Sequence, residues 1–271
     1  MSAISRDVTS AGMAAAIEAN LNAAFPLFSS LPSIELHDEP ALRWLITPDV
    51  PFPLFNHVYW TRLPQESIDV RVEEVRERFA ACQVPMMWSI GPFTRPSDLG
   101  SRLEARGAAH AEDLPGMALD LQALNEDVPS PDGLAIEGVG NAESLREYVD
   151  VAKVGFELPE VVAQAFFDAF GALGLVGDRP VRHYVGRLDR EAVASATLVL
   201  MAGIAGIYNV ATLPKARRQG VGAAMTLAAL REACKLGYRI GILQSSAAGF
   251  NVYRRLGFEQ YSTYSVYVWA A

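Results

Sequence analysis

A basic turn with two glycines, Arg-Arg-Gln-Gly-Val-Gly-Ala at residues 217–223, is the feature that most constrains this chain. An apolar run ends before Pro214, ahead of the turn, and apolar residues recur at helical spacing over residues 224–235 after it. This pattern predicts a strand, a turn and a helix. The first amides of such a helix have no acceptor within the helix and lie at the positive end of its dipole. Gly220 and Gly222 lack side chains and two arginines add positive charge, so the turn predicts a pyrophosphate-binding site.

Two common phosphate-binding loops do not fit this turn. A nucleoside triphosphate loop needs a Gly-Lys-Ser/Thr ending, whereas Gly222 is followed by two alanines. The dinucleotide fingerprint needs three glycines in a wider frame near the start of its domain. The spacing Arg217-x-x-Gly220-x-Gly222 instead resembles the coenzyme A (CoA) loop of the GNAT acyltransferase superfamily.

A second segment, Val-Tyr-Arg-Arg-Leu-Gly-Phe at residues 252–258, resembles the Leu-Tyr-x-x-Leu-Gly-Phe helix that ends the core of that superfamily. The two motifs stand in the family's order, with a predicted helix and strand between them. The resemblance implies an α/β (α+β) fold with a mixed, largely antiparallel GNAT-type sheet flanked by helices. It also implies acetyl-CoA as the cosubstrate.

Composition excludes several other classes of protein. The chain has 271 residues, about half of them apolar, which is typical of a globular protein with ample core. A net charge of −8 argues against nucleic-acid binding, and no apolar run is long enough for a membrane span. Cys82 and Cys234 fall in predicted helices, so no disulfide framework is expected and a cytoplasmic location is the default. No cluster has metal-ligand spacing, and no metal is predicted.

The two halves of the chain suggest an internal duplication. Elements follow the same order from Asn56 to Gly107 and from Asn209 to Gly257, intervals of 51 and 48 residues. The alternative is that any two α/β segments look alike at this level of detail. In the first copy, residues 64–69 replace the phosphate loop with a stretch that has no glycine and two carboxylates. We therefore expect that this copy does not bind CoA and helps to shape the acceptor pocket. The plan resembles tandem members of the superfamily, including the mycothiol synthase type.

A polar stretch rich in proline, aspartate and glycine, residues 125–133, is the predicted linker. It separates a degenerate GNAT-like domain at 1–124 from an acetyl-CoA-binding domain at 134–271. The predicted helices are one within 1–30 that ends before Pro26, and 70–82, 97–106, 142–154, 160–170, 224–235 and 248–256. The predicted strands are 55–59, 86–90, 117–121, 134–139, 182–187, 192–201, 204–213, 239–243 and 265–269, whereas 39–46 is ambiguous.

The resemblance assigns roles residue by residue. Tyr253 matches the tyrosine that protonates the departing CoA thiolate in many members, and a phenol can donate that proton. The alternative is that Tyr253 is only a core residue of its helix. Many members have an asparagine and an alanine where this chain has Ser246 and Gly249. The predicted cofactor-binding residues are Val210, Ala211 and Thr212 for the pantetheine, Arg217, Arg218, Gln219, Gly220, Val221, Gly222 and Ala223 for the pyrophosphate, and Ser246.

No general base is evident from the sequence. Glu157 could face the acceptor entrance or be an ordinary solvated glutamate, and His183 is either functional or a satisfied core histidine. Asn209 and Gln244 are polar groups in apolar strands, so each needs a partner.

The predicted function is transfer of an acetyl group from acetyl-CoA to a primary amine of a small molecule or peptide, directly in a ternary complex. The alternative is a non-catalytic CoA-binding or sensing module whose N-terminal domain binds a partner. Either protein would be a monomer or a homodimer.

Overall fold

The computed structural model describes residues 3–270, which divide into two compact units. The first unit contains Met1–Leu27 and Gly116–Tyr261, and the second contains Phe28–Pro115 and Ser262–Ala271. Each unit therefore combines segments from both halves of the chain. The predicted domains, 1–124 and 134–271, are instead contiguous in sequence, and that division stays a prediction. Residues 125–133 contain no helix or strand.

The first unit contains a sheet with the strand order β5-β10-β9-β8-β7-β6. Neighbouring strands are antiparallel except β9 and β10, which are parallel. This mixed, largely antiparallel sheet confirms the predicted fold class. Its strands are β5 (Ala109–Asp120, in this unit from Gly116), β6 (Ala135–Gly138), β7 (Val181–Leu188), β8 (Glu191–Met201), β9 (Ile204–Thr212) and β10 (Ile240–Gln244).

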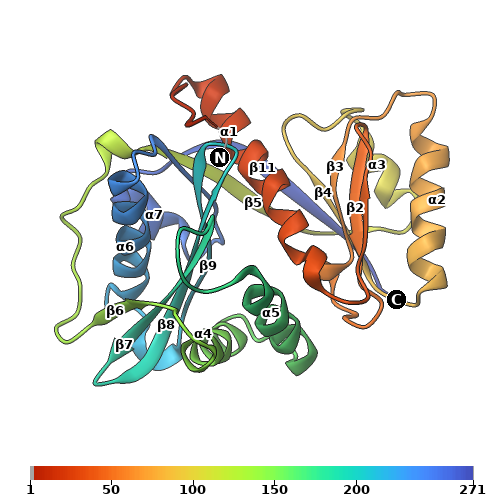
Figure 1. Ribbon diagram of the computed structural model, residues 1–271. Coiled ribbons are helices and arrows are strands. Elements are labelled where there is room, and N and C mark those ends of the chain that lie inside the picture. Colours follow the sequence, from red (N-terminus) through yellow and green to blue (C-terminus); the bar gives the residue numbers. More distant parts are fainter. Residues whose placement is uncertain (1–2, 271) are drawn as a thin grey trace. The chain divides into compact units, whose positions relative to one another are not determined.

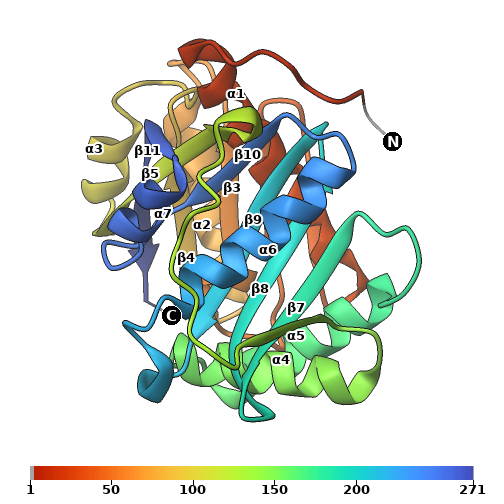
Figure 2. The ribbon, with the colours of Figure 1, turned by 90° about the vertical axis from the view of Figure 1, so that its left-hand side faces the viewer.

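Helices cover both faces of this sheet (Figures 1 and 2). On one face, Leu227 and Leu230 of α6 pack against Leu198 of β8. On the other face, Tyr148 of α4 contacts Thr197 of β8. Successive strand residues point to opposite faces, so Thr197 and Leu198 place α4 and α6 on opposite sides. The helices of this unit are α1 (Ser10–Ala24), α4 (Ala142–Gly155), α5 (Glu160–Leu173), α6 (Val221–Lys235) and α7 (Phe250–Leu256).

Helix α1 is fastened to the β8–β9 hairpin through Asn20, which is fully buried. The Asn20 amide nitrogen donates to the carbonyl oxygens of Val199, Met201 and Ile204 at 3.0–3.2 Å. The Tyr208 hydroxyl in turn donates to the Asn20 side-chain oxygen at 2.8 Å. A buried amide with all these partners is satisfied, and it fixes the N-terminal helix against the strand that leads to the basic turn.

The second unit is a sheet with the strand order β1-β2-β3-β4-β11 and helix α2 on it. Its core includes Val72 and Phe79 of α2, which pack with Trp44 and Trp88 of the sheet. Strands β3 and β4 are parallel and the other neighbours are antiparallel. The elements are β1 (Glu35–Asp38), β2 (Leu42–Ile46), β3 (His57–Thr61), α2 (Ile68–Ala81), β4 (Met86–Ile90), α3 (Leu99–Glu104) and β11 (Glu259–Trp269, in this unit from Ser262).

The order of elements repeats along the chain. An antiparallel hairpin, a helix, a parallel strand, a short helix and a last strand occur as β2-β3-α2-β4-α3-β5 and again as β8-β9-α6-β10-α7-β11. The last strands are exchanged, because β5 pairs with β10 and β11 pairs with β4. This order agrees with the predicted duplication, and the exchange explains why the compact units are not contiguous in sequence.

Most predicted elements occur within a few residues of their expected positions. The ambiguous segment 39–46 contains strand β2, and β1 was not predicted. The helix expected within 1–30, with its end before Pro26, is α1, which ends at Ala24 and is followed by a 3₁₀ turn at Phe25–Ser30. Strands β5 and β11 begin 8 and 6 residues earlier than predicted, at Ala109 and Glu259, because their first residues are exposed and carry no apolar pattern. Within residues 3–270, no helix is long and apolar enough to cross a membrane.

Candidate active site

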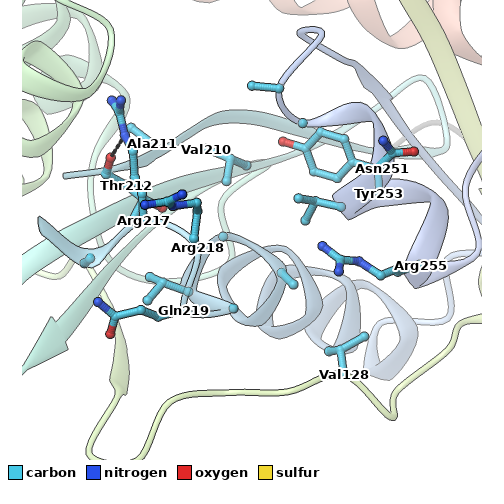
Figure 3. Close-up of a pocket in the computed structure, with 18 of the residues that line it drawn as sticks. Val128, Val210, Ala211, Thr212, Arg217, Arg218, Gln219, Asn251, Tyr253 and Arg255 are labelled. Carbon is cyan, nitrogen blue, oxygen red and sulfur yellow. Dashed lines mark hydrogen bonds between the residues drawn. The ribbon is translucent and has the colours of Figure 1, made fainter. Parts of the chain in front are cut away.

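A cleft of about 1440 Å³ in the first unit gathers the predicted site residues (Figure 3). Its walls come from five segments, namely the predicted linker, the end of α4, the end of β9, the basic turn with the start of α6, and α7 with the residues before it. All twelve predicted site residues line it: Val210, Ala211, Thr212, Arg217, Arg218, Gln219, Gly220, Val221, Gly222, Ala223, Ser246 and Tyr253. The sequence did not predict the contributions of Asn125, Asp127, Val128, Pro129, Gly155, Asn251 and Arg255.

The basic turn leads into α6 through two residues with left-handed backbone. Arg218 and Gly220 both have left-handed backbone, with φ of 63° and 88°, and α6 begins at Val221. Gly220 is the N-cap of α6 and offers no side-chain acceptor. The amides of the first helical turn therefore lack acceptors within the helix. They lie at the positive end of a 15-residue helix and can bind a phosphate.

The two glycines of the turn have different surroundings. A Cβ atom on Gly222 would meet only Oγ1 of Thr212, at 3.7 Å, so this position borders open space. A Cβ atom on Gly220 would lie 2.4 Å from the carbonyl oxygen of Pro129. Gly220 is thus required by its positive φ and by the close approach of the linker, whereas Gly222 leaves the helix amides accessible from the cleft.

The side chains of the turn divide into engaged and free groups. Arg217 donates to the carbonyl oxygens of Thr212 at 2.9 Å and Gly155 at 3.2 Å, so it joins the end of β9 to the end of α4 (Figure 3). Gln219 donates to the carbonyl oxygen of Lys215 at 3.1 Å. Arg218 has no hydrogen-bond or ion-pair partner among the described residues. Its guanidinium is therefore the group of this turn that is available to an anion.

Strand β9 separates from β10 where it reaches the cleft. The two strands pair only at Ala205 and Gly206, and β9 continues for another six residues to Thr212. The separation coincides with a β-bulge, because two residues of β9 oppose Ala196 of β8 and one of them, Asn209, has a φ of 51°. A bulge bends its strand away from a neighbour. Residues 210–212 consequently border the cleft along the edge where β10 no longer pairs with β9.

Buried polar side chains support the bulge from the α4 side. The Ser195 hydroxyl donates to the Asn209 carbonyl oxygen at 3.1 Å. The Tyr148 hydroxyl lies 2.5 Å from Oγ1 of Thr197, and the same Oγ1 lies 2.9 Å from Nδ1 of His183. Burial raises the pKa of Tyr148 to about 12. Its hydrogen bonds to Thr197 and Asn209 lower the pKa, but by less than burial raises it. The network gives Asn209 and His183 the partners that their strand positions require.

His183 is a core residue and does not line the cleft. It is 5% exposed, and its ring packs against those of Tyr148 and Phe170. Burial lowers its pKa to about 3, so the ring is neutral at physiological pH. The structure therefore favours the structural interpretation of this histidine over a catalytic one.

Tyr253 extends from α7 into the cleft, with its hydroxyl directed toward the side of Val210 in Figure 3. Burial raises the pKa of its phenol to about 12, so the proton is retained at neutral pH. A Cβ atom on Gly249 would lie 2.7 Å from Cε2 of this ring. Ser246 accepts a hydrogen bond from the Gly249 amide at 3.2 Å through its hydroxyl oxygen, so it also shapes the turn before α7.

Glu157 lines the cleft directly after α4, next to the exposed ring of Phe156. Its backbone has a φ of 56°, a left-handed conformation that is uncommon for a residue with a side chain. Strained residues of this kind cluster at functional sites.

Gln244 does not line this cleft, and its amide nitrogen is buried without a hydrogen-bond partner among the described residues. Across residues 3–270, no group of three or more histidine, cysteine, aspartate or glutamate side chains could hold a metal ion.

Comparison with known proteins agrees with this geometry. Residues 179–260 match the acetyltransferase (GNAT) domain model. No curated protein sequence matches the chain. A GCN5-related N-acetyltransferase from Kribbella flavida superimposes with a TM-score of 0.70 at 22% identity, over 92% of this chain and 95% of that one.

Two further solved structures cover nearly the whole chain. One from Sphaerobacter thermophilus, also a GCN5-related N-acetyltransferase, has a TM-score of 0.64 at 15% identity, over 97% of this chain and 94% of that one. A tandem GNAT protein from the clavulanic acid biosynthesis pathway has a TM-score of 0.62 at 16% identity, over 98% of this chain and 96% of that one. Residues 179–260 are therefore similar to the acetyltransferase (GNAT) domain, and the chain as a whole has the fold of GNAT proteins.

Proposed function

We propose that this protein transfers an acetyl group from acetyl-CoA to a primary amine of a small molecule or peptide. The observation that carries the proposal is the convergence of three groups on one cleft. These are the amides and arginine of an anion-binding turn, the unpaired edge of a bulged strand, and the hydroxyl of Tyr253. Together they offer an anion site, a backbone for pairing with an extended chain, and a proton donor.

The turn would bind the pyrophosphate of acetyl-CoA. The amides of Val221, Gly222 and Ala223 belong to the first turn of α6, and Arg218 adds a free guanidinium. Backbone amides at a helix N-terminus and an arginine are both suited to phosphate oxygens. The pantetheine arm would run along residues 210–212, where its amides would pair with backbone groups of β9 that β10 leaves free.

The acetyl transfer would be a direct displacement in a ternary complex. The amine nitrogen attacks the thioester carbon, the carbon–sulfur bond breaks, and Tyr253 gives its phenolic proton to the departing sulfur. The amine loses a proton as the amide forms, and Glu157, one of the two carboxylates on the cleft wall, could accept it. Holding both substrates in the cleft would supply much of the rate acceleration.

The N-terminal repeat would not bind a second CoA. Where the first repeat would need a phosphate loop, α2 begins at Ile68 and carries Asp69 in its first turn. The Asp69 carboxylate already faces Arg102 and Arg106 and places negative charge at the helix N-terminus. It would repel a phosphate there, which supports a single acetyl-CoA per chain.

Gly222 offers a direct test of the anion site. We would titrate acetyl-CoA calorimetrically into the wild type and into the matched variants Gly222→Asp and Gly222→Asn. Either side chain fits the open space at this position, and an aspartate in the first helical turn favours the helix itself. We expect the Asp variant to bind acetyl-CoA at least about tenfold more weakly than the Asn variant, because the carboxylate repels the pyrophosphate.

Turnover is tested separately, by measuring CoA thiol release in the presence of a panel of primary amines. Acceleration of thiol release by one class of amine would support the transferase. Binding of acetyl-CoA without turnover of any amine would favour the non-catalytic CoA-sensing module. No binding of acetyl-CoA to the wild type would contradict both.

A further inference from the structure

Arg255 is a charged group of the cleft that the proposed function does not use. It belongs to α7 and extends into the cleft from the side opposite the basic turn (Figure 3). Its guanidinium has no hydrogen-bond or ion-pair partner among the described residues. Other arginines of the same unit are paired, such as Arg231 with Glu126 and Arg239 with Asp120. The positive charge of Arg255, on the α7 side of the cleft, is therefore not compensated by a carboxylate in the described part of the chain.

The main chain around Arg255 is held in place by the linker. The Asn125 amide nitrogen donates to the Arg255 carbonyl oxygen at 2.8 Å, and the Asn125 backbone N–H donates to the Leu256 carbonyl oxygen at 3.1 Å. These bonds fix the end of α7 beside the cleft, while the long Arg255 side chain is exposed. An arginine on a fixed backbone position can bind a phosphate through two parallel hydrogen bonds.

A comparison of the cations of the cleft with the phosphates of CoA leaves one cation and one phosphate without a partner. CoA carries a pyrophosphate and, on its ribose, a separate 3′-phosphate. The α6 amides and Arg218 suit the pyrophosphate, and Arg217 is occupied with two carbonyl oxygens. Asp127 and Glu157 are the carboxylates on the cleft wall. Arg255 is then the cation that remains for a second phosphate.

We propose that Arg255 recognises the 3′-phosphate of CoA, so that the cleft distinguishes CoA from 3′-dephospho-CoA. This inference rests on the proposed function, because it requires CoA to bind in this cleft. The adjacent Arg254 is a matched control. It lies on the same helix and is exposed, and its side chain has no hydrogen-bond or ion-pair partner among the described residues, yet it does not line the cleft.

The test compares the dissociation constants of CoA and 3′-dephospho-CoA by calorimetry for the wild type, Arg255→Gln and Arg254→Gln. We expect the wild type to prefer CoA by about tenfold, the range of a charge-assisted contact at a partly exposed site. In Arg255→Gln the preference should fall to near unity, through weaker binding of CoA and unchanged binding of 3′-dephospho-CoA. Arg254→Gln should keep the preference of the wild type.

Each other outcome overturns the inference in a recognisable way. Equal affinity of the wild type for the two ligands would refute 3′-phosphate recognition and leave the proposed function standing. Equal weakening of both ligands by Arg255→Gln would show that Arg255 contacts another part of CoA. The same loss of preference in Arg254→Gln would show a general effect of surface charge. If the wild type binds neither ligand, the proposed function fails as well.

Discussion

The ring of Tyr253 occupies the space that a side chain on Gly249 would need, since a Cβ atom there would lie 2.7 Å from Cε2 of the ring. Real Cβ atoms do not approach so closely, so the ring and a larger residue at position 249 are incompatible without movement. The absence of a side chain at 249 is therefore coupled to the position of the tyrosine. The glycine at 249, where the family pattern commonly has alanine, thus leaves room for the Tyr253 ring in the position that it has here.

We predict that Gly249→Ala displaces the Tyr253 ring and lowers kcat by about tenfold, because a catalytic group that moves by an ångström loses much of its effect. Acetyl-CoA affinity should change little. A double-mutant cycle with Tyr253→Phe gives the control: without the hydroxyl, the alanine at 249 should have almost no further effect on kcat. Additive losses in the double variant would show that Gly249 acts through something other than Tyr253.

Tyr253→Phe itself should lower kcat by about 100-fold or more, the usual contribution of a positioned acid, with unchanged affinity for acetyl-CoA. The phenylalanine keeps the packing against the Phe258 ring, so loss of fold is not expected. Tyr261→Phe, which removes a hydroxyl bonded to Glu259 on β11, is the matched control and should leave kcat unaltered. Wild-type kcat in the Tyr253 variant would rule out the acid role.

The local motifs predicted which residues of the basic turn and α7 line the cleft, because each motif consists of residues that are close together in the sequence. Contributions from the linker could not be predicted in this way. Asn125 reaches the cleft through a hydrogen bond to Arg255, 130 residues later in the chain. The composition of the linker predicts only an irregular segment. No local pattern in the sequence predicts where in the fold such a segment lies.

The pairing between strands that are distant in the sequence could not be predicted either. The exchange of β5 and β11 depends on contacts such as Leu119 with Gly241, which local periodicity cannot encode. Similarly, the alternatives for His183 stayed open until its partners were known. Its bond to Thr197 crosses a hairpin, and its ring contacts come from α4 and α5.

Glu157→Gln should lower kcat/KM by about ten- to 100-fold if the carboxylate accepts the proton of the attacking amine. Acetyl-CoA binding should persist, because the change removes a negative charge from the cleft rather than adding one. The control is Glu160→Gln, which alters a carboxylate three residues away that pairs with Lys153 and does not line the cleft. Equal activity of the two variants would exclude Glu157 as the base.

We predict that His183 makes the free energy of unfolding depend on pH. Burial lowers its pKa in the folded state to about 3, whereas in the unfolded chain it should titrate near 6.5. Between these values the unfolded chain binds a proton that the folded protein does not. The free energy of unfolding therefore falls as the pH drops from above 6.5 toward 3, by about 2 kcal/mol from this group at pH 5.

Urea unfolding of the wild type and His183→Gln at pH 7 and pH 5 measures this contribution. The variant should be less stable than the wild type at pH 7, because glutamine does not fill the space between the Tyr148 and Phe170 rings. It should nevertheless lose less stability than the wild type between pH 7 and pH 5, because its side chain does not titrate. The carboxylates titrate equally in both proteins and cancel in the comparison. Equal losses in the two proteins would mean that His183 binds its proton as readily in the folded state as in the unfolded chain.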